Sequence, residues 1–312
     1  MLINVPNADD LDEMALRLYF DAWERNITLQ FEFAEFFEIH DAKLDGEHEY
    51  KGEWAEYVAL AQSELGVICA TIQQSAELRL KSIICCISPF LLLLNGAVPF
   101  KSSHNNNIDF SEQRTLDAVD LPNAVLTLTD FDLPRSYVEQ YGAMRRLRNQ
   151  ITHLGSHKGG LTPYQLFKIL GQQYVSLWPD GRWLFRRVKF DGNSARRFFH
   201  DERYSSVESN VMAELPYTID VLDNSTFKKM FGVAKGKLKG FCPSCMNARA
   251  SKWDAQGHAT AHQTGSNTAK CAMCEREFTL QTLKKGCSEC GSKTCIEDTD
   301  SYDALCFSCG HS

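Results

Sequence analysis

Apolar residues recur at helical spacing through the first part of the chain. Residues 8–38 place apolar side chains three or four positions apart, and Asn7 or Asp9 is a suitable N-cap for a helix that begins there. A second apolar stripe covers residues 53–94, where Pro89 is expected to kink the helix. The polar, glycine-containing segment between these two stretches predicts a loop.

Shorter helical patterns follow a turn-rich segment at residues 95–112. Residues 135–153 again have helical spacing, and Thr162-Pro163 is a typical helix start. The segment 173–190 fits either the end of a helix or a hairpin around its Pro-Asp-Gly turn. One more helix is expected within residues 203–223.

A basic, glycine-rich segment from Lys235 to Gly240 marks the expected domain boundary. We predict a helical domain at residues 1–234 and a small β-structured region at residues 235–312, where most of the cysteines lie. The expected fold class is therefore mainly α, a helical bundle followed by a small β region.

The chain carries a net charge of −7 over 312 residues, which excludes a uniformly basic nucleic-acid-binding protein. The charge is unevenly spread. From Phe227 onward there are 12 Lys and Arg against 8 Asp and Glu, a net charge of +4, which leaves −11 for the preceding residues. A weakly basic tail indicates contact with an anionic partner, unless its charges are only solvated.

The first ten residues lack the basic and then apolar segments of a secretory signal. The longest apolar run, residues 83–94, is shorter than the ~20 residues that a membrane-spanning helix needs. We therefore expect a cytoplasmic protein without a membrane partner, in a compartment where thiols stay reduced.

Four Cys-x-x-Cys pairs, called knuckles below, lie near the end of the chain. Twelve cysteines in a reducing compartment indicate metal rather than disulfides. A gap of two residues lets both thiolates of a tight turn face one zinc ion. Four thiolates complete a tetrahedron and leave no position for water, so we expect two structural zinc ions. The predicted ligands are Cys242, Cys245, Cys271, Cys274, Cys287, Cys290, Cys306 and Cys309.

The last two pairs are separated by 15 residues, and a glycine follows the second cysteine of each. This segment resembles the zinc ribbons of transcription factors and many nucleases. The resemblance implies that the last two pairs share one zinc and the first two pairs share the other, with Cys295 on a strand of the ribbon. Ribbons bind nucleic acid or protein, and Lys284, Lys285 and Arg276 favour contact with phosphate.

A different pairing is also compatible with the spacing. Cys242, Cys245, His258 and His262 have the ligand spacing of a DNA-reading zinc finger. That arrangement would pair the second and third knuckles and would leave the fourth to recruit Cys295 and His311.

The end of the helix expected at 135–153 contains Arg148-Asn149-x-x-x-His153. This motif resembles the signature of HEPN-domain ribonucleases, in which an Arg and a His lie a few residues apart. The segment 76–81, with Glu77, is similar to the acidic and basic positions of that family's central helix. The resemblance covers residues 50–180 and departs from toxin-type members at Gly155, where they often have Tyr.

The resemblance implies a HEPN-like bundle, a homodimer with a composite site, and RNA cleavage that needs no metal. His153 would act as general base or acid, because an imidazole titrates near neutral pH. Arg148 would hold the phosphate, Asn149 would orient the histidine or bind a phosphate oxygen, and Arg145 and Arg146 would attract RNA. Such domains commonly serve as stress or antiphage effectors.

Helix geometry limits how one protomer uses this motif. Arg148 and His153 lie about 140° apart around a single helix and about 7.5 Å apart along it. Asn149 and His153 share a face, so a dimer would bring two such faces to one groove. A simpler interpretation involves no catalysis. The arginines would form a solvated face of the helix, and the helix dipole would favour His153 near its C-terminus. Glu77 would be a buried partner for a basic residue.

Two other functions fit these features. The first is a non-catalytic module whose dimeric helical domain and ribbons bind nucleic acid or a protein partner. The second is a ribbon-containing transcription factor that binds a specific duplex sequence.

Overall fold

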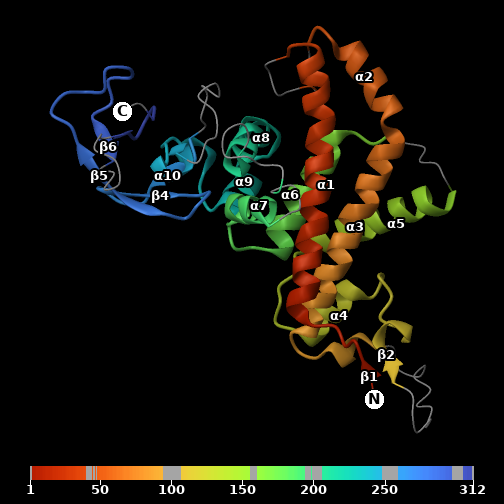
Figure 1. Cartoon of the computed structure of the whole chain (residues 1–312). Coiled ribbons are helices and arrows are strands. Elements are labelled where there is room, and N and C mark those ends of the chain that lie inside the picture. Colours follow the sequence, from red (N-terminus) through yellow and green to blue (C-terminus); the bar gives the residue numbers. More distant parts are fainter. Residues whose placement is uncertain are drawn as a thin grey trace. The chain divides into compact units, whose positions relative to one another are not determined.

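A computed structural model describes residues 2–39, 44, 46, 48–93, 107–154, 160–193, 198, 206–247, 259–296 and 305–310. The chain forms two compact units, the first reaching Leu177 and the second beginning at Trp178 (Figure 1). The structure is mainly helical with a small antiparallel sheet near the C-terminus, which confirms the predicted fold class at this level. No helix within the described ranges has the length and apolarity that crossing a membrane requires.

The first unit is built from six helices among its described residues. Asn7 caps the first of them, as predicted, because its side-chain oxygen accepts hydrogen bonds from the N–H groups of Asp9 and Asp10. Two short strands, β1 (Leu2–Ile3) and β2 (Ile108–Asp109), pair in parallel. The helices are α1 (Ala8–Phe36), α2 (Lys51–Leu60), α3 (Gln62–Cys85), α4 (Leu121–Leu128), α5 (Arg135–Leu154) and α6 (Pro163–Leu177), with 3-10 turns η1 (Pro89–Leu92) and η2 (Phe110–Glu112).

The apolar stripe at 53–94 is divided between α2, α3 and η1, so the prediction of one long helix is wrong. Ala61 lies at the junction, where its N–H donates to Tyr57 and its carbonyl accepts from Leu65. The apolar spacing continues across this junction, so the pattern does not reveal it. Helix α3 then ends at Cys85, and Pro89 starts a separate turn capped by Ser88.

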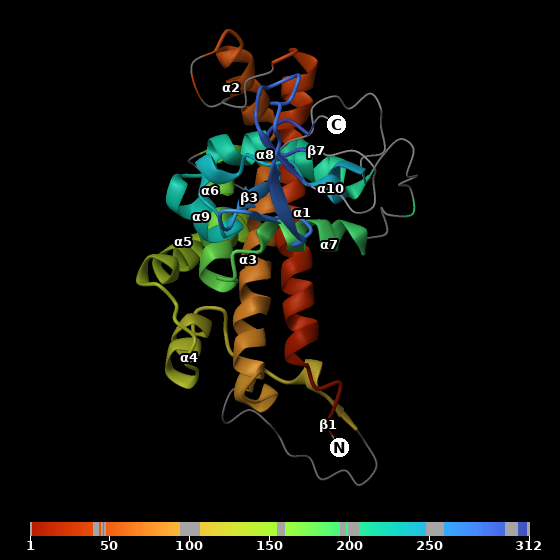
Figure 2. The same cartoon turned by 90° about the vertical axis from the view of Figure 1, so that its left-hand side faces the viewer.

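Helices α1 and α3 form the centre of the first unit, lying side by side along most of their length (Figures 1 and 2). The Ser75 hydroxyl donates to the Ala15 carbonyl at 2.8 Å across this buried interface. Helix α6 packs on α1, where the Asn26 amide donates to the Pro163 carbonyl at 2.9 Å. These buried polar contacts fix the relative positions of the three helices, because leaving such groups unpaired is costly.

The second unit begins with three helices, α7 (Trp183–Gly192), α8 (Val207–Val221) and α9 (Asn224–Phe231). Helix α6 ends at Leu177 and a turn leads directly into α7, so the hairpin considered for residues 173–190 does not form. Arg187 on α7 is 1% exposed and forms ion pairs with Asp191 and, at 2.7 Å, with Glu214 on α8.

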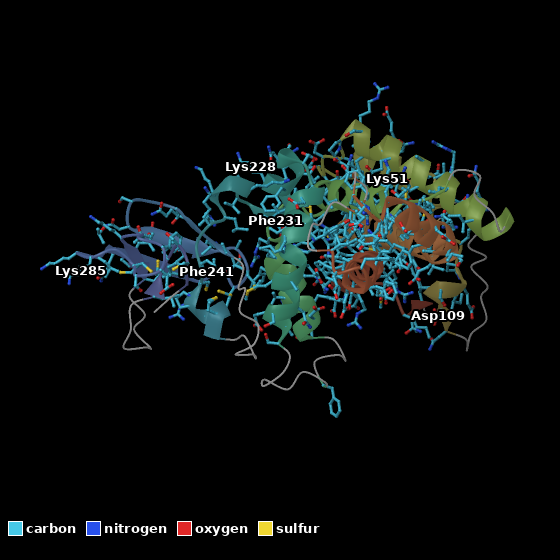
Figure 3. All side chains as sticks on the ribbon, turned by 90° about the horizontal axis from the view of Figure 1, so that it is seen from above. Lys51, Asp109, Lys228, Phe231, Phe241 and Lys285 are labelled. Atoms are coloured by element: carbon cyan, nitrogen blue, oxygen red, sulfur yellow. The ribbon has the colours of Figure 1, made fainter. Side chains whose placement is uncertain are left out.

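The cysteine-rich region belongs to the same unit. Arg182, which precedes α7, binds both carboxylate oxygens of Glu275, with its Nε at 2.8 Å from Oε1. The two compact units divide at Leu177, so the expected boundary at 235 lies inside the second unit, where the contact between Arg182 and Glu275 joins its two parts. Figure 3 shows Phe231 among these helices and Phe241 close to the sulfur atoms of the region.

A five-stranded antiparallel sheet runs through the cysteine-rich region in the order β3-β4-β5-β6-β7. The first half of β5 pairs with β4 and its second half pairs with β6, so this one strand joins the two halves of the sheet. The strands are β3 (Ala261–Gln263), β4 (Thr268–Cys271), β5 (Glu277–Thr282), β6 (Thr294–Ile296) and β7 (Leu305–Cys306), preceded by η4 (Lys235–Lys237) and the short helix α10 (Pro243–Asn247).

Candidate metal centres and candidate active site

Four cysteines from two knuckles meet at the first candidate metal centre. Cys242 and Cys245 lie at α10, while Cys271 ends β4 and Cys274 follows in a turn. The sulfurs of Cys242 and Cys274 are 3.6 Å apart, and those of Cys245 and Cys271 are 3.7 Å apart. A zinc tetrahedron with bonds of about 2.3 Å has sulfur–sulfur edges of about 3.8 Å, so this spacing fits a bound zinc.

The second centre has the same construction. Cys287 and Cys290 face Cys306 and Cys309, with 3.6 Å between the sulfurs of Cys287 and Cys309. Backbone N–H groups of Cys290 and Glu289 lower the pKa of the Cys287 thiol to about 6. This shift favours the thiolate, which is the form that binds a metal.

Three of the knuckles end in a left-handed residue. Gly291 and Gly310 follow Cys290 and Cys309 with φ of 72°, and Glu275 follows Cys274 with φ of 61°. The left-handed turn lets the backbone N–H of the next residue approach the cysteine sulfur, as the hydrogen bonds from Arg276 to Cys274 and from Ser292 to Cys290 illustrate. Glycine adopts this conformation freely, whereas Glu275 does so at a cost.

The observed grouping confirms the ribbon pairing and contradicts the finger-like alternative. Cys242 and Cys245 share their centre with Cys271 and Cys274, so His262 is not needed as a ligand and lies on β3, paired with Lys270. Cys295 lies on β6 opposite Cys306, as expected for a ribbon strand. His258 and His311 lie outside the described residues.

The arginine of the candidate active site contacts a distant acidic residue. Arg148 on α5 forms an ion pair with Glu77 on α3, with 2.9 Å between Nη2 and Oε1. A second guanidinium nitrogen donates to the Asn149 side chain at 3.2 Å, and Gln73 donates to Glu77 at 3.4 Å. The expectation that Glu77 serves as a partner for a basic residue is confirmed.

The ion pair is partly buried, and burial raises the pKa of two neighbouring groups. The Arg148 side chain is 30% exposed and Glu77 is 17% exposed, so the pair is only partly shielded from water. Burial and the nearby Glu77 carboxylate raise the pKa of Tyr141 above its usual range, and burial raises the pKa of the Cys69 thiol to about 12. Both groups therefore stay neutral at neutral pH.

The other predicted site residues lie along the same helix. Arg145 is half-buried and Arg146 is exposed. His153 belongs to the last turn of α5, but its side chain lies outside the described residues, so its position relative to Arg148 stays a prediction. Gln73 and Tyr141, which the sequence pattern did not single out, join the site because α3 and α5 pack together.

Comparison with known proteins does not assign the chain to a family. No family model matches the chain, and no match was found among curated proteins or among solved structures.

Proposed function

We propose that the chain is a metal-independent endoribonuclease of the HEPN type, with His153, Arg148 and Asn149 in the active site. The observation that carries this proposal is the contact between Glu77 and Arg148, which are 71 residues apart in sequence. Both residues belong to segments that resemble the family, and each lies on its own helix. Their meeting supports the proposal, because each segment resembles the family through its own sequence, independently of this contact.

In this proposal the 2′-hydroxyl of RNA attacks the adjacent phosphorus, and the bond from phosphorus to the 5′-oxygen breaks. His153 accepts the proton of the 2′-hydroxyl or supplies the proton that the departing 5′-oxygen takes up. The products are a 2′,3′-cyclic phosphate and a 5′-hydroxyl. Arg148 stabilises the charge that develops on the phosphate oxygens.

The ion pair suits Arg148 to this role. Glu77 and Asn149 hold the guanidinium in a defined orientation, while its 30% exposure leaves a side that a phosphate can reach. A positioned guanidinium loses less entropy on binding phosphate than a free one. Arg145 and Arg146 on the same helix would attract RNA to an acidic body, and a homodimer would join two such helix ends in one groove.

Incubation of the purified protein with total RNA and tRNA tests the proposal. Wild type should produce fragments with cyclic-phosphate ends during a brief exposure to EDTA. His153→Ala and Arg148→Ala should each lower the cleavage rate by about 100-fold or more. Arg135→Ala is a matched control, because Arg135 lies on the same helix, is 94% exposed, and pairs with Glu139.

Two results would overturn the proposal. One is cleavage that persists in His153→Ala, which would indicate a contaminating nuclease. The other is the absence of cleavage by wild-type protein across both RNA pools under conditions where the circular dichroism spectrum shows a folded chain.

A non-catalytic binding module is the second candidate, and one observation favours it. Arg148 already has a carboxylate partner at 2.9 Å, which gives it a sufficient structural role in holding α5 against α3. In that case Arg148→Ala should lower stability without changing any RNA cleavage, while the ribbons bind nucleic acid or protein.

We also propose that zinc occupies both four-cysteine centres. Four thiolates with tetrahedral spacing favour zinc over calcium or magnesium, which prefer oxygen ligands. Metal analysis of protein purified without chelator should give two zinc ions per chain. A value near zero, or iron in place of zinc, would contradict this assignment.

A further inference from the structure

An open pocket lies where the end of α1 meets α2, far along the chain from the Arg148 motif. Its volume is about 450 Å³. The lining combines aromatic or aliphatic side chains with three carboxylates: Glu32, Phe33, Phe36, Phe37, Glu53, Glu56, Tyr57 and Leu60. This size lies within the range of roughly 300–1,000 Å³ that is typical of small-molecule sites.

The floor of the pocket is a packed aromatic cluster. Phe33 is 3% exposed and meets Trp54 edge to face, with 4.9 Å between ring centres. Tyr57 stacks on Trp54 at 5.8 Å and is 5.5 Å from Phe33. Phe37 contacts Phe33 at 4.6 Å. Rings packed in this way present fixed faces and edges to a ligand.

The walls of the pocket are apolar and poorly covered. Phe36 is 79% exposed and Leu60 is 78% exposed, the highest values among the large apolar residues of the first unit that the structure describes. Covering these side chains removes apolar surface from water, which is favourable for any ligand with an apolar body.

The rim carries negative charge. Glu32, Glu53 and Glu56 are exposed, and within the described residues no basic side chain forms an ion pair with them. The Tyr57 hydroxyl donates to Glu32 at 3.2 Å. Burial and Glu32 raise the pKa of Tyr57 to about 12, so the phenol stays neutral and adds no positive or negative charge of its own at neutral pH.

We propose that this pocket binds a small organic cation, an alkylammonium ion with an apolar body. Aromatic faces carry partial negative charge and attract ammonium groups, and carboxylates around them strengthen that attraction. An anion is excluded by the rim, and a neutral apolar ligand leaves the three carboxylates without a counter-charge. The proposal is independent of the ribonuclease proposal, because no residue of the Arg148 site lines the pocket.

The test compares choline with 3,3-dimethylbutan-1-ol, which has the same shape without the charge. Isothermal titration calorimetry of the full zinc-loaded chain should show saturable binding of choline, at least about fivefold tighter than binding of the alcohol. Equal affinity for the two compounds would overturn the proposal, as would no binding of choline at concentrations up to about 10 mM.

Variants locate the binding. Phe36→Ala and Glu56→Gln should each weaken choline binding, and neither residue is buried, so the fold should persist. Phe90→Ala is the matched control, because Phe90 is 57% exposed on η1 and does not line the pocket. Choline affinity that is unchanged in Phe36→Ala, or lowered equally in Phe90→Ala, would contradict the assignment to this pocket.

Discussion

Individual residues in the cysteine-rich region have conformations that their own chemistry does not favour. Glu275 is the clearest case, since it occupies a left-handed position that Gly291 and Gly310 occupy in two other knuckles. Its carboxylate makes the bidentate contact with Arg182, which glycine could not make. Glu275 therefore has a strained backbone conformation, and its side chain connects the start of α7 to the first metal centre.

Substitution at position 275 separates these two effects. Glu275→Ala and Glu275→Gly both remove the ion pair, but alanine keeps the left-handed strain. We expect Glu275→Gly to be more stable than Glu275→Ala by about 1 kcal/mol in urea unfolding of the zinc-loaded protein. Arg182→Gln keeps the left-handed glutamate but removes the ion pair and the contact of the guanidinium with the Phe185 ring. It should cost less than about 1 kcal/mol because both side chains of the pair are partly exposed. Equal stability of the two position-275 variants would show that the turn is unstrained.

The Glu77–Arg148 pair can be measured in the same way. A double-mutant cycle with Glu77→Gln and Arg148→Gln should give a coupling of roughly 0.5–1.5 kcal/mol, reduced by the partial exposure of both side chains. A coupling near zero would show that the two helices are held by apolar packing alone, and would remove the positioning role proposed for Glu77.

At the scale of elements, the two metal centres are connected by close packing. A Cβ atom added at Gly240 would overlap the Phe307 ring, so only glycine fits beside it. Phe307 lies between two ligands of the second centre, and its carbonyl accepts from the N–H of Phe241, next to the first centre. The segment that leads into the first metal centre therefore packs directly on the second metal centre.

Gly240→Ala should displace the Phe307 ring and destabilise the region by about 1–3 kcal/mol. The loss should appear as easier zinc release to a chromogenic chelator, and Phe307→Ala in the same chain should restore part of it. Gly236→Ala is the control, because a Cβ there meets no atom within 4 Å. Unchanged zinc release in Gly240→Ala would contradict the close packing.

The sequence predicted those elements that depend on local spacing. The Cys-x-x-Cys pairs and Asn7, as one of two cap candidates, follow from residues close together in the chain, whereas the ribbon pairing is what the zinc-ribbon resemblance implies. The structure confirms all three. The junction at Ala61 was missed, because neither proline nor glycine interrupts the apolar stripe there. The pocket beside Phe36 was also missed, because it forms only when α1 and α2 meet, and aromatic residues on one helix do not by themselves indicate a cavity.

At the scale of the whole molecule, the two compact units have different sources of stability. The first has a large apolar core around α1 and α3, with Trp23 and Leu65 fully buried. The cysteine-rich part of the second has short strands and few large buried side chains within its described residues, so metal ligation should provide much of its folding free energy.

Removal of zinc should therefore unfold the chain unevenly. Treatment with a strong chelator should abolish proteolytic resistance across residues 259–310 while helical circular dichroism at 222 nm largely remains. Hydrogen exchange by mass spectrometry would compare the two parts in one sample. Peptides from the strands should lose protection, and peptides from α1 and α3 serve as internal controls. Loss of protection in α1 and α3 together with the strands would contradict the separate stability of the first unit.

Strand β5 has a further consequence for the order in which the metals bind. Because β5 pairs with β4 through its first half and with β6 through its second half, folding around one ion fixes the strand that the other site also needs. Part of the ordering entropy for the second ion has then already been lost, so its binding is easier than the first. Zinc uptake should consequently be positively cooperative, and native mass spectrometry during a titration should show the metal-free and two-metal species, with the one-metal species depleted below the level expected for independent sites.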